Sequence, residues 1–261
     1  MLFRSTQLNS LTSTQLAFVT TDQIQKLTTA QIRNLTTDQL NALSTDQVAN
    51  LTTAQVSAIK TEQLQALSTD LMVSMTSLQV SKLTTSQLNN LSTDQLENLT
   101  SDQMQGLTSA QLKSLTVGNL AELSTDVIGN LSTQQLQGLS TAQVVALTTE
   151  QAQALTSTQL VKFTTAQIAA LESDDLNTLS TDEVVELSGS QLASLKASQL
   201  NSLSSDLLVA VTTTQLQSLT TTQVHDLISA QLSYMLTDQF KALNTAQISA
   251  MSNTQLASLS T

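Results

Sequence analysis

Few side chains in this sequence belong to the types that perform catalysis. His225 is the single histidine among 261 residues, and cysteine is absent. A nucleophile activated by a neighbouring base therefore lacks its usual partners, and a thiolate metal site is excluded. The five glycines form no phosphate-binding loop. We predict no catalytic and no cofactor-binding residue, expect that the protein is not an enzyme, and interpret His225 as a solvated surface residue.

The densest group of acidic side chains is the one candidate for a metal site. It consists of Asp174, Asp175, Asp182 and Glu183. Carboxylate oxygens suit hard cations, so a weak cation site is conceivable at this place. The ligand spacing of an EF-hand and the glycine-rich nonapeptide of calcium β-rolls are both missing. We interpret these acids as residues at helix starts and predict no metal-binding residue.

Hydroxyl and glutamine side chains recur with a period of eight residues, between two apolar series. The first series runs in steps of eight from Phe3 to Leu259, and the second runs from Leu8 to Leu256; every member is apolar. Ser or Thr follows the first series in twenty-six of thirty-three cases. Gln precedes the second series in twenty-six of thirty-two cases, the exceptions being Leu71, Asn119, Val127, Asp175, Glu183 and Leu207. The absence of any insertion predicts a solenoid in which each octad is one fixed structural step.

Each octad has the pattern of a short capped helix. One continuous helix does not fit the pattern, because eight residues turn a helix by about 800°, which is about 80° more than two full turns. The apolar stripe would therefore drift around the helix surface. In a β-solenoid, the alternative interpretation, the two series fall on opposite faces of a strand. With Ser44 as N-cap, Gln47 completes a capping box, and Leu43 and Val48 form the hydrophobic staple. We predict an all-α solenoid with one very short helix per octad.

The charged residues support this helical register. Thirteen of the twenty acids fall at the second helical position, where the helix dipole favours anions: Asp22, Asp38, Asp46, Glu62, Asp70, Asp94, Asp102, Asp126, Glu150, Asp174, Asp182, Asp206 and Asp238. Six of the nine cations are expected in last turns: Lys26, Arg33, Lys82, Lys113, Lys162 and Lys241. Left-handed residues are expected to end helices at Asn34, Asn50, Asn98, Gly106, Asn130 and Gly138.

The predicted helices are too short to be stable alone, so their stacking must supply the core. A helix of about seven residues is marginal because nucleation is costly. Stacked neighbours bury both apolar series in one continuous ribbon. We predict a single uninterrupted solenoid over residues 1–261, with about 32 repeats and no capping repeats. If two octads form one layer at a helix spacing of ~8–10 Å, the rod measures on the order of 150 Å.

Composition narrows the range of partners. The formal net charge of −11 disfavours nucleic acids and anionic membrane surfaces. The longest apolar run, residues 207–211, is too short to span a bilayer, and the first residues do not resemble a Sec signal peptide. Hydroxyl arrays can bind ice or glycans, but here caps consume the hydroxyls. Acceptor patterns for N-glycosylation arise wherever Asn precedes a repeat Leu: Asn34, Asn50, Asn90, Asn98 and Asn130. Phe18 and Tyr234, at variable positions, are candidates to face a partner.

The octad L-[ST]-T-[DA]-Q-[LIV] resembles the tandem repeats of very long bacterial surface or exported proteins, described as related to adhesion or haem utilisation. The resemblance covers the whole chain and implies a bacterial source and a structural or adhesive role. It carries over no haem ligand, because His225 and the six methionines form no recognisable site.

These observations predict a non-catalytic structural repeat that forms a rod, stalk or filament at a bacterial surface. The alternative is an extended binding or adhesion module for a protein or glycan partner. Both ends of the chain are in register with the octads, so we expect end-to-end self-association or continuation into a longer repeat tract, with no nucleic acid and no membrane insertion. An extracellular or cell-surface location reached without the Sec route is expected; the alternative is cytoplasmic.

Overall fold

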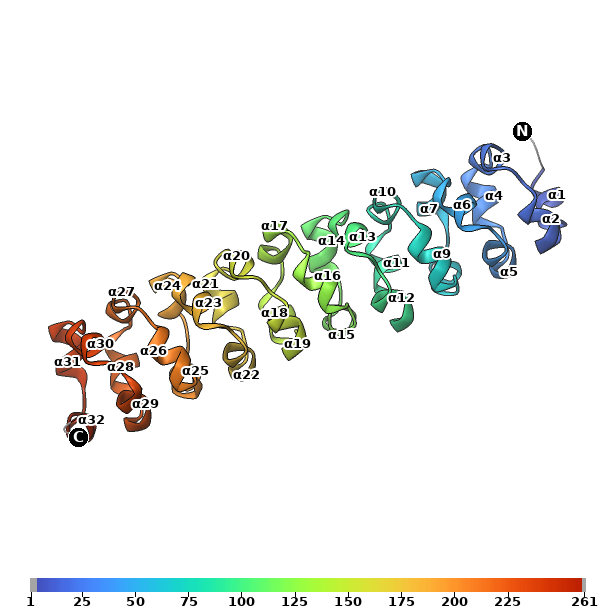
Figure 1. The fold of residues 1–261 in the computed structure, drawn as a ribbon. Coiled ribbons are helices and arrows are strands. Elements are labelled where there is room, and N and C mark those ends of the chain that lie inside the picture. Colours follow the sequence, from blue (N-terminus) through green and yellow to red (C-terminus); the bar gives the residue numbers. More distant parts are fainter. Residues whose placement is uncertain (1–3, 260–261) are drawn as a thin grey trace. The chain divides into compact units, whose positions relative to one another are not determined.

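The computed structural model describes residues 4–259, so Phe3, the first member of the first apolar series, lies outside the described residues. Within that part of the chain every octad forms one helix and no strand is present. Figure 1 shows the helices following one another in sequence order. They are α1 (Ser5–Asn9), α2 (Ser13–Ala17), α3 (Thr21–Gln25), α4 (Thr29–Arg33), α5 (Thr37–Asn41), α6 (Thr45–Ala49), α7 (Thr53–Ala58), α8 (Thr61–Gln65), α9 (Thr69–Ser74), α10 (Ser77–Val80), α11 (Thr85–Asn89), α12 (Thr93–Glu97), α13 (Ser101–Gln105), α14 (Ser109–Ser114), α15 (Val117–Ala121), α16 (Thr125–Gly129), α17 (Thr133–Gln137), α18 (Thr141–Val145), α19 (Thr149–Gln153), α20 (Ser157–Leu160), α21 (Thr165–Ile168), α22 (Ser173–Asn177), α23 (Thr181–Glu186), α24 (Gly189–Leu192), α25 (Ala197–Ser202), α26 (Ser205–Ala210), α27 (Thr213–Gln217), α28 (Thr221–Asp226), α29 (Ser229–Tyr234), α30 (Thr237–Lys241), α31 (Thr245–Ala250) and α32 (Asn253–Ser258).

The predicted all-α solenoid of short capped helices is confirmed, and the β-solenoid alternative is wrong. The helices are shorter than the predicted seven residues and contain four to six. The reason is visible after α7, where two successive residues are extended: Ile59 has φ −58° and ψ 132°, and Lys60 has φ −71° and ψ 154°. This pair of extended residues, at the first apolar position and the N-cap, breaks the helix, and the N-caps of other octads, such as Ser44 and Thr76, are extended as well.

The thirteen acids predicted at the second helical position all lie in the first turn of a helix, as expected. The cations follow the prediction only in part. Arg33, Lys113 and Lys241 lie in last turns, and Lys26 is the C-cap of α3. Lys82 and Lys162 fall beyond the C-caps of α10 and α20, because those helices end a residue early.

The predicted left-handed helix ends are wrong, since no residue between 4 and 259 has a positive φ. The asparagine side chains cap the helices in another way: Nδ2 of Asn50, of Asn98 and of Asn130 each donates to the carbonyl four residues earlier at 2.8 Å. The same nitrogen is the atom to which a glycan would be attached. The two glycines permit close packing, because a Cβ at Gly106 would lie 2.6 Å from the carbonyl oxygen of Ser77 in α10.

Each turn of the solenoid takes between three and four octads. The most closely packed helices are three octads apart, as α4 and α7 are and α28 and α31 are. Hydrogen bonds from α5 reach the helix four octads earlier, where Gln39 contacts the carbonyls of Leu8 and Leu11. The assumption of two octads per layer is therefore wrong. Because one turn does not contain a whole number of octads, residues two or three octads apart do not occupy equivalent places in the solenoid. The sequence therefore shows no period of sixteen or twenty-four residues.

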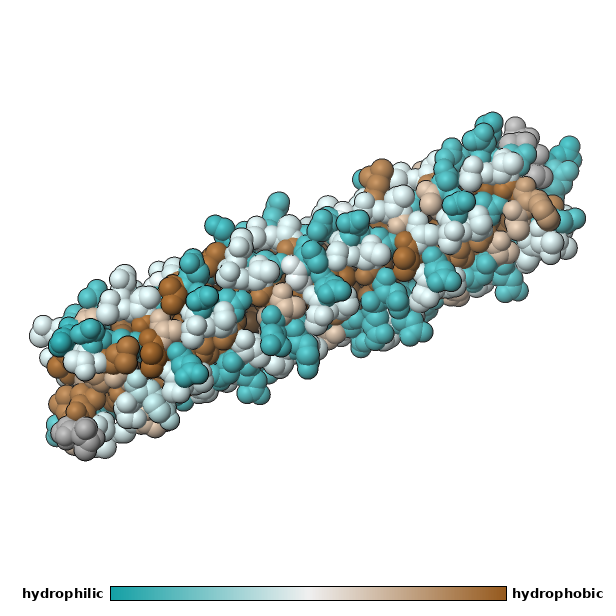
Figure 2. Space-filling model, viewed as in Figure 1, coloured by the Kyte–Doolittle hydropathy of each residue, from teal (hydrophilic) through white to brown (hydrophobic). Residues whose placement is uncertain are grey.

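Both apolar series build the core, as predicted. The first series is buried from Val19 to Leu227 and the second from Leu8 to Leu232. Ile248 in α31 and Leu256 in α32 are part-exposed, because these helices pack on a preceding turn alone. Figure 2 shows a mainly hydrophilic to intermediate surface on which apolar residues form small patches.

The contacts divide the chain into two compact units, Met1–Gly138 and Leu139–Thr261. The same turn, with the same spacing between contacting helices, repeats inside each unit. The single solenoid over residues 1–261 stays a prediction. No helix between residues 4 and 259 has the length and apolar character that crossing a membrane requires.

Candidate functional site

The capping box predicted for the octad of α6 is present. Ser44, with φ −75° and ψ 160°, is the N-cap. Its hydroxyl accepts a hydrogen bond from the backbone N–H of Gln47 at 3.1 Å, and Oε1 of Gln47 accepts from the N–H of Ser44 at 2.8 Å. Leu43 and Val48, the predicted staple, are both buried. Four residues thus begin the helix and attach it to the core.

The glutamine has a second role that the capping box does not predict. Nε2 of Gln55 donates to the carbonyls of Ile24 and Leu27, 31 and 28 residues earlier, both at 2.8 Å. These carbonyls stand at the end of α3, where helical partners run out. One buried side chain therefore satisfies the start of its own helix and the end of a helix in the preceding turn. The sequence signal is the near-absence of Glu at this position, although Glu and Gln cap a helix equally well.

Four octads carry Leu, Asn or Val at this third helical position, in place of Gln or an acid. In these octads the N-cap hydroxyl still accepts from the third backbone N–H, at 3.1 to 3.4 Å. The reciprocal bond and the bonds to the preceding turn are lost. The residues at the third position are Leu71, Asn119, Val127 and Leu207.

The acidic group lies at the starts of α22 and α23. Oδ2 of Asp175 accepts from the N–H of Glu172 at 3.2 Å, and Oε2 of Glu183 accepts from the N–H of Ser180 at 2.7 Å. Both acids therefore keep the cap, but a carboxylate has no N–H for the carbonyls of the preceding turn. Within residues 4–259, no three side chains of His, Asp and Glu are placed to hold a metal ion.

The environment of Asp175 alters the pKa of its side chain. Its side chain is buried, and this burial is the main cause that raises its pKa. The nearby charges of Glu172 and Asp174 act in the same direction, while hydrogen bonds from the Glu172 backbone and the Thr149 side chain oppose it. In most octads a neutral glutamine occupies this buried position instead.

The other residues singled out in the sequence lie apart on the surface. His225 is exposed, with Nδ1 3.0 Å from Oδ1 of Asp226 on the same helix. Phe18 is 83% exposed and is the C-cap of α2, whereas Tyr234 ends α29 and is 46% exposed. The structure brings none of them together with the acidic group.

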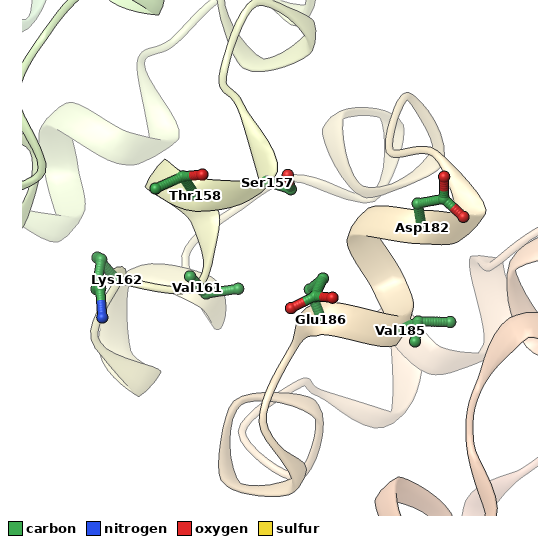
Figure 3. Close-up of a pocket in the computed structure, with 7 residues that line it drawn as sticks. All are labelled: Ser157, Thr158, Val161, Lys162, Asp182, Val185 and Glu186. Atoms are coloured by element: carbon green, nitrogen blue, oxygen red, sulfur yellow. The ribbon is translucent and has the colours of Figure 1, made fainter.

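A surface groove lies between α20 and α23. Figure 3 shows Val161 and Lys162, which directly follow α20, on one side of the groove, with Val161 pointing toward Glu186 of α23 on the other side. Val185 of α23 also contributes to the lining. Ser157, Thr158 and Asp182 complete its lining. Neither hydroxyl has a histidine beside it, so the groove holds no activated nucleophile.

The comparisons with known proteins support a repeat tract. The model of a family described as ALTTAQ repeat matches six overlapping or neighbouring segments, which together cover more than half of the chain: residues 24–53, 72–109, 80–117, 120–157, 128–165 and 168–205. A search of curated proteins finds no match. The matched segments contain the same Leu-hydroxyl-Gln octads that build the turns of both units. The chain therefore belongs to the ALTTAQ repeat family.

Proposed function

We propose that this chain is a non-catalytic structural repeat that forms an elongated rod, stalk or filament at a bacterial surface. The observation that carries the proposal is the use of the polar residues. The hydroxyls and glutamines that recur in most octads bind backbone groups of their own helix and of the preceding turn, as Thr52 and Gln55 do. Side chains that hydrogen-bond to the backbone are unavailable to bind a ligand. The repeat is therefore suited to extending the solenoid rather than to binding.

The acidic composition and the absence of cysteine support export and solubility in the oxidising environment outside the cell. We therefore propose an extracellular or cell-surface location, with the cytoplasm as the alternative. Fractionation of cells that produce the full chain tests this location, and recovery in the soluble cytoplasmic fraction alone would reject the surface assignment.

The length of the chain in solution tests the rod. With between three and four octads per turn and ~8–10 Å between stacked helices, about nine turns extend over roughly 70–90 Å. Deletion of residues 44–75, four whole octads, leaves every cross-turn spacing intact and should shorten the maximum dimension in small-angle scattering by about one eighth. A matched control removes residues 44–71, which are not whole octads, and should disrupt folding. A compact sphere for the parent chain would reject the proposal.

We propose that the apolar surface of α30–α32 is covered either by a second copy, end to end, or by further octads of a longer repeat tract. Leu236, Ile248 and Leu256 are 50%, 39% and 42% exposed there. In earlier octads, the following turn of the same repeat covers the second apolar series, to which Ile248 and Leu256 belong, whereas Leu236 is an N-cap. We expect apparent mass in light scattering to rise with concentration, and the change Ile248→Glu with Leu256→Glu to abolish the rise. Phe18→Glu is the control, and a parent chain that stays monomeric contradicts association.

An alternative proposal, an extended binding module, draws support from exposed valines on stacked helices. Val185 of α23 and Val209 of α26 are 45% and 42% exposed, and these two helices pack together. They offer an apolar strip to a protein or glycan. Cosedimentation with purified cell-wall glycan should be lost in Val185→Ser with Val209→Ser and retained in Val117→Ser. Equal sedimentation of all variants would remove this strip from consideration.

A further inference from the structure

Asparagine at one octad position forms a second kind of bridge between turns. This position directly follows the second apolar series, at the end of a helix. In α22, Nδ2 of Asn177 donates to the carbonyl of Ser202 at 2.9 Å, and its Oδ1 accepts from the N–H of Ser204 at 2.8 Å. Ser202 ends α25 and Ser204 is the N-cap of α26, so one amide holds both sides of the link between these two helices.

The same geometry recurs at three other asparagines. Asn41 binds the carbonyl of Ala66 at 2.8 Å and the N–H of Ser68 at 2.9 Å. Asn89 binds Ser114 and Thr116 at 2.8 and 2.9 Å. In each case the carbonyl is 25 residues ahead and the N–H is 27 residues ahead. The repeated spacing makes this a defined site of the fold.

The asparagines stand where the capping glutamine is missing. The third helical position lies 30 residues after the asparagine, and there Asn41, Asn89 and Asn177 face Leu71, Asn119 and Leu207 in place of Gln. These three octads lack the Oε1 that elsewhere accepts the N-cap N–H. They also lack the Nε2 that bridges to the preceding turn. The asparagine supplies one acceptor and one cross-turn donor, which are the two functions that were lost.

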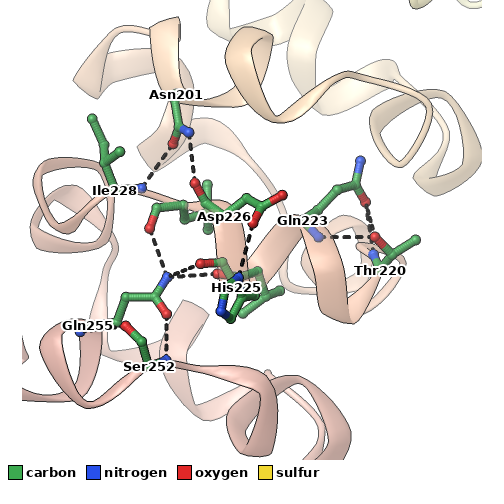
Figure 4. A network of polar contacts seen from close by, with 10 residues as sticks. Asn201, Thr220, Gln223, His225, Asp226, Ile228, Ser252 and Gln255 are labelled. Carbon is green, nitrogen blue, oxygen red and sulfur yellow. Dashed lines mark hydrogen bonds and ion pairs between the residues drawn. The ribbon is translucent and has the colours of Figure 1, made fainter.

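The fourth example shows direct competition between the two amides. Figure 4 shows Asn201 bound to the Asp226 carbonyl and the Ile228 N–H, at 2.8 and 3.0 Å. The octad of α29 retains Gln231, but Oε1 of Gln231 is buried without a partner. Ile228 has no hydroxyl to complete a box. The asparagine has therefore displaced the glutamine from the N-cap.

Two octads show what the pairing requires. Asn9 occupies the asparagine position, but Gln39 is present 30 residues later, and Oε1 of Gln39 takes the N–H of Thr36 at 3.0 Å. The reverse case is Val127, where the glutamine is missing and Glu97 occupies the asparagine position. Glu97 cannot form the complete bridge, since a carboxylate can accept from an N–H but cannot donate to a carbonyl.

We infer that Asn41, Asn89, Asn177 and Asn201 are positioning residues that tie successive turns of the solenoid together and replace the capping glutamine 30 residues later. The ties fix which N-cap lies beside which helix end, so they hold the register of the turns at octads whose own cap is incomplete. This role is independent of the location or partner of the chain, and it explains why the tract tolerates loss of Gln at some octads.

Hydrogen exchange of the N-cap amides tests the ties in the full chain. Asn177→Ala should lower the protection of the Ser204 N–H about tenfold, the value of one lost hydrogen bond. Adding Leu207→Gln should restore protection, because the new Oε1 reaches the same N–H. The matched control Asn9→Ala should leave Thr36 protected as before. Unchanged protection of Ser204, or no recovery in a double variant with parental circular dichroism, would overturn the inference.

A gain-of-function variant covers the case in which Asn177→Ala unfolds locally. Glu97→Asn changes an exposed side chain and creates the missing pair for the Val127 octad. The N–H of Ser124, 27 residues ahead, should become about tenfold better protected. Glu97→Gln, one methylene longer, is the control and should give a smaller gain. No increase at Ser124 in Glu97→Asn would contradict the pairing rule.

Discussion

The octads of α7 and α22 carry Gln55 and Asp175 at the third helical position, and this difference shows what the recurring glutamine contributes. Both begin with an extended N-cap, and both place an acceptor oxygen on the N-cap N–H, from Gln55 in α7 and from Asp175 in α22. Gln55 also donates to two carbonyls of the preceding turn. Asp175 has no donor to offer, and it places a carboxyl with a raised pKa in the same buried position.

The comparison of Gln55 with Asp175 separates two functions of this position, which are to start a helix and to join one turn to the next. Starting a helix requires an acceptor, which either residue supplies. Joining one turn to the next requires a donor, which only the amide supplies. A carboxylate at this position therefore preserves the local helix but weakens the contact between turns. We call the contact between a helix and the preceding turn a joint. We expect the joint of α22 to be weaker than that of α7, although both helices pack on the same aliphatic ribbon.

Disruption of that ribbon should have the largest effect, and an equal one in both regions. Leu43→Asp, beside the glutamine octads, and Leu171→Asp, directly before α22, each place an unpaired charge in a buried position. Each should lower the free energy of unfolding by roughly 3–5 kcal/mol in urea titration. Phe18→Asp, on the exposed surface, should change it by less than about 0.5 kcal/mol. A mild effect at Leu171 alone would show that α22 does not share the ribbon.

Removing the donor while keeping the acceptor should have the next largest effect. Gln47→Glu preserves the bond to the Ser44 N–H but loses the bonds from Nε2 to Leu16 and Val19 and buries a charge. We expect a loss of roughly 2–3 kcal/mol in the same titration. Gln15→Glu is the matched control, because exposed Gln15 forms the same box with Thr12 and makes no bond to another turn. Equal losses in both variants would refute the second role of the glutamine.

The period-eight pattern was sufficient to predict the helices, their N-caps and both buried series, because these depend on residues within one octad. Ser44, Gln47, Leu43 and Val48 lie within six positions of each other. The bonds from Gln55 to Ile24 and Leu27 were not predictable, since their spacing depends on how many octads close a turn. The helix ends were misjudged for a related reason: Asn50 closes its own helix through a side-chain bond, without a left-handed backbone.

Giving the weak joint an amide should produce a smaller, stabilising effect. Asp175→Gln restores a donor toward the carbonyls 28 and 31 residues earlier, those of Leu147 and Val144, and removes a buried acid. We expect a gain of about 1–2 kcal/mol at pH 7 in urea titration. Asp182→Asn, an exposed change at the second helical position, is the control and should be neutral or slightly destabilising. Loss of stability in Asp175→Gln would indicate that the acid has a favourable role in this joint.

The smallest effect should appear when pH is lowered. Because burial raises the pKa of Asp175 above its ordinary value of 3.8, the folded state holds this proton at a pH where the unfolded state has released it. The contribution of the proton to stability is complete below that ordinary value and disappears as pH rises through the folded pKa. The advantage of Asp175→Gln over the parent should therefore shrink as pH falls from 7 toward 4, while effects of the other carboxylates cancel in the difference. Urea titrations of both chains across this range measure it, and an advantage that grew in acid would contradict the burial of Asp175 as the source of the weak joint.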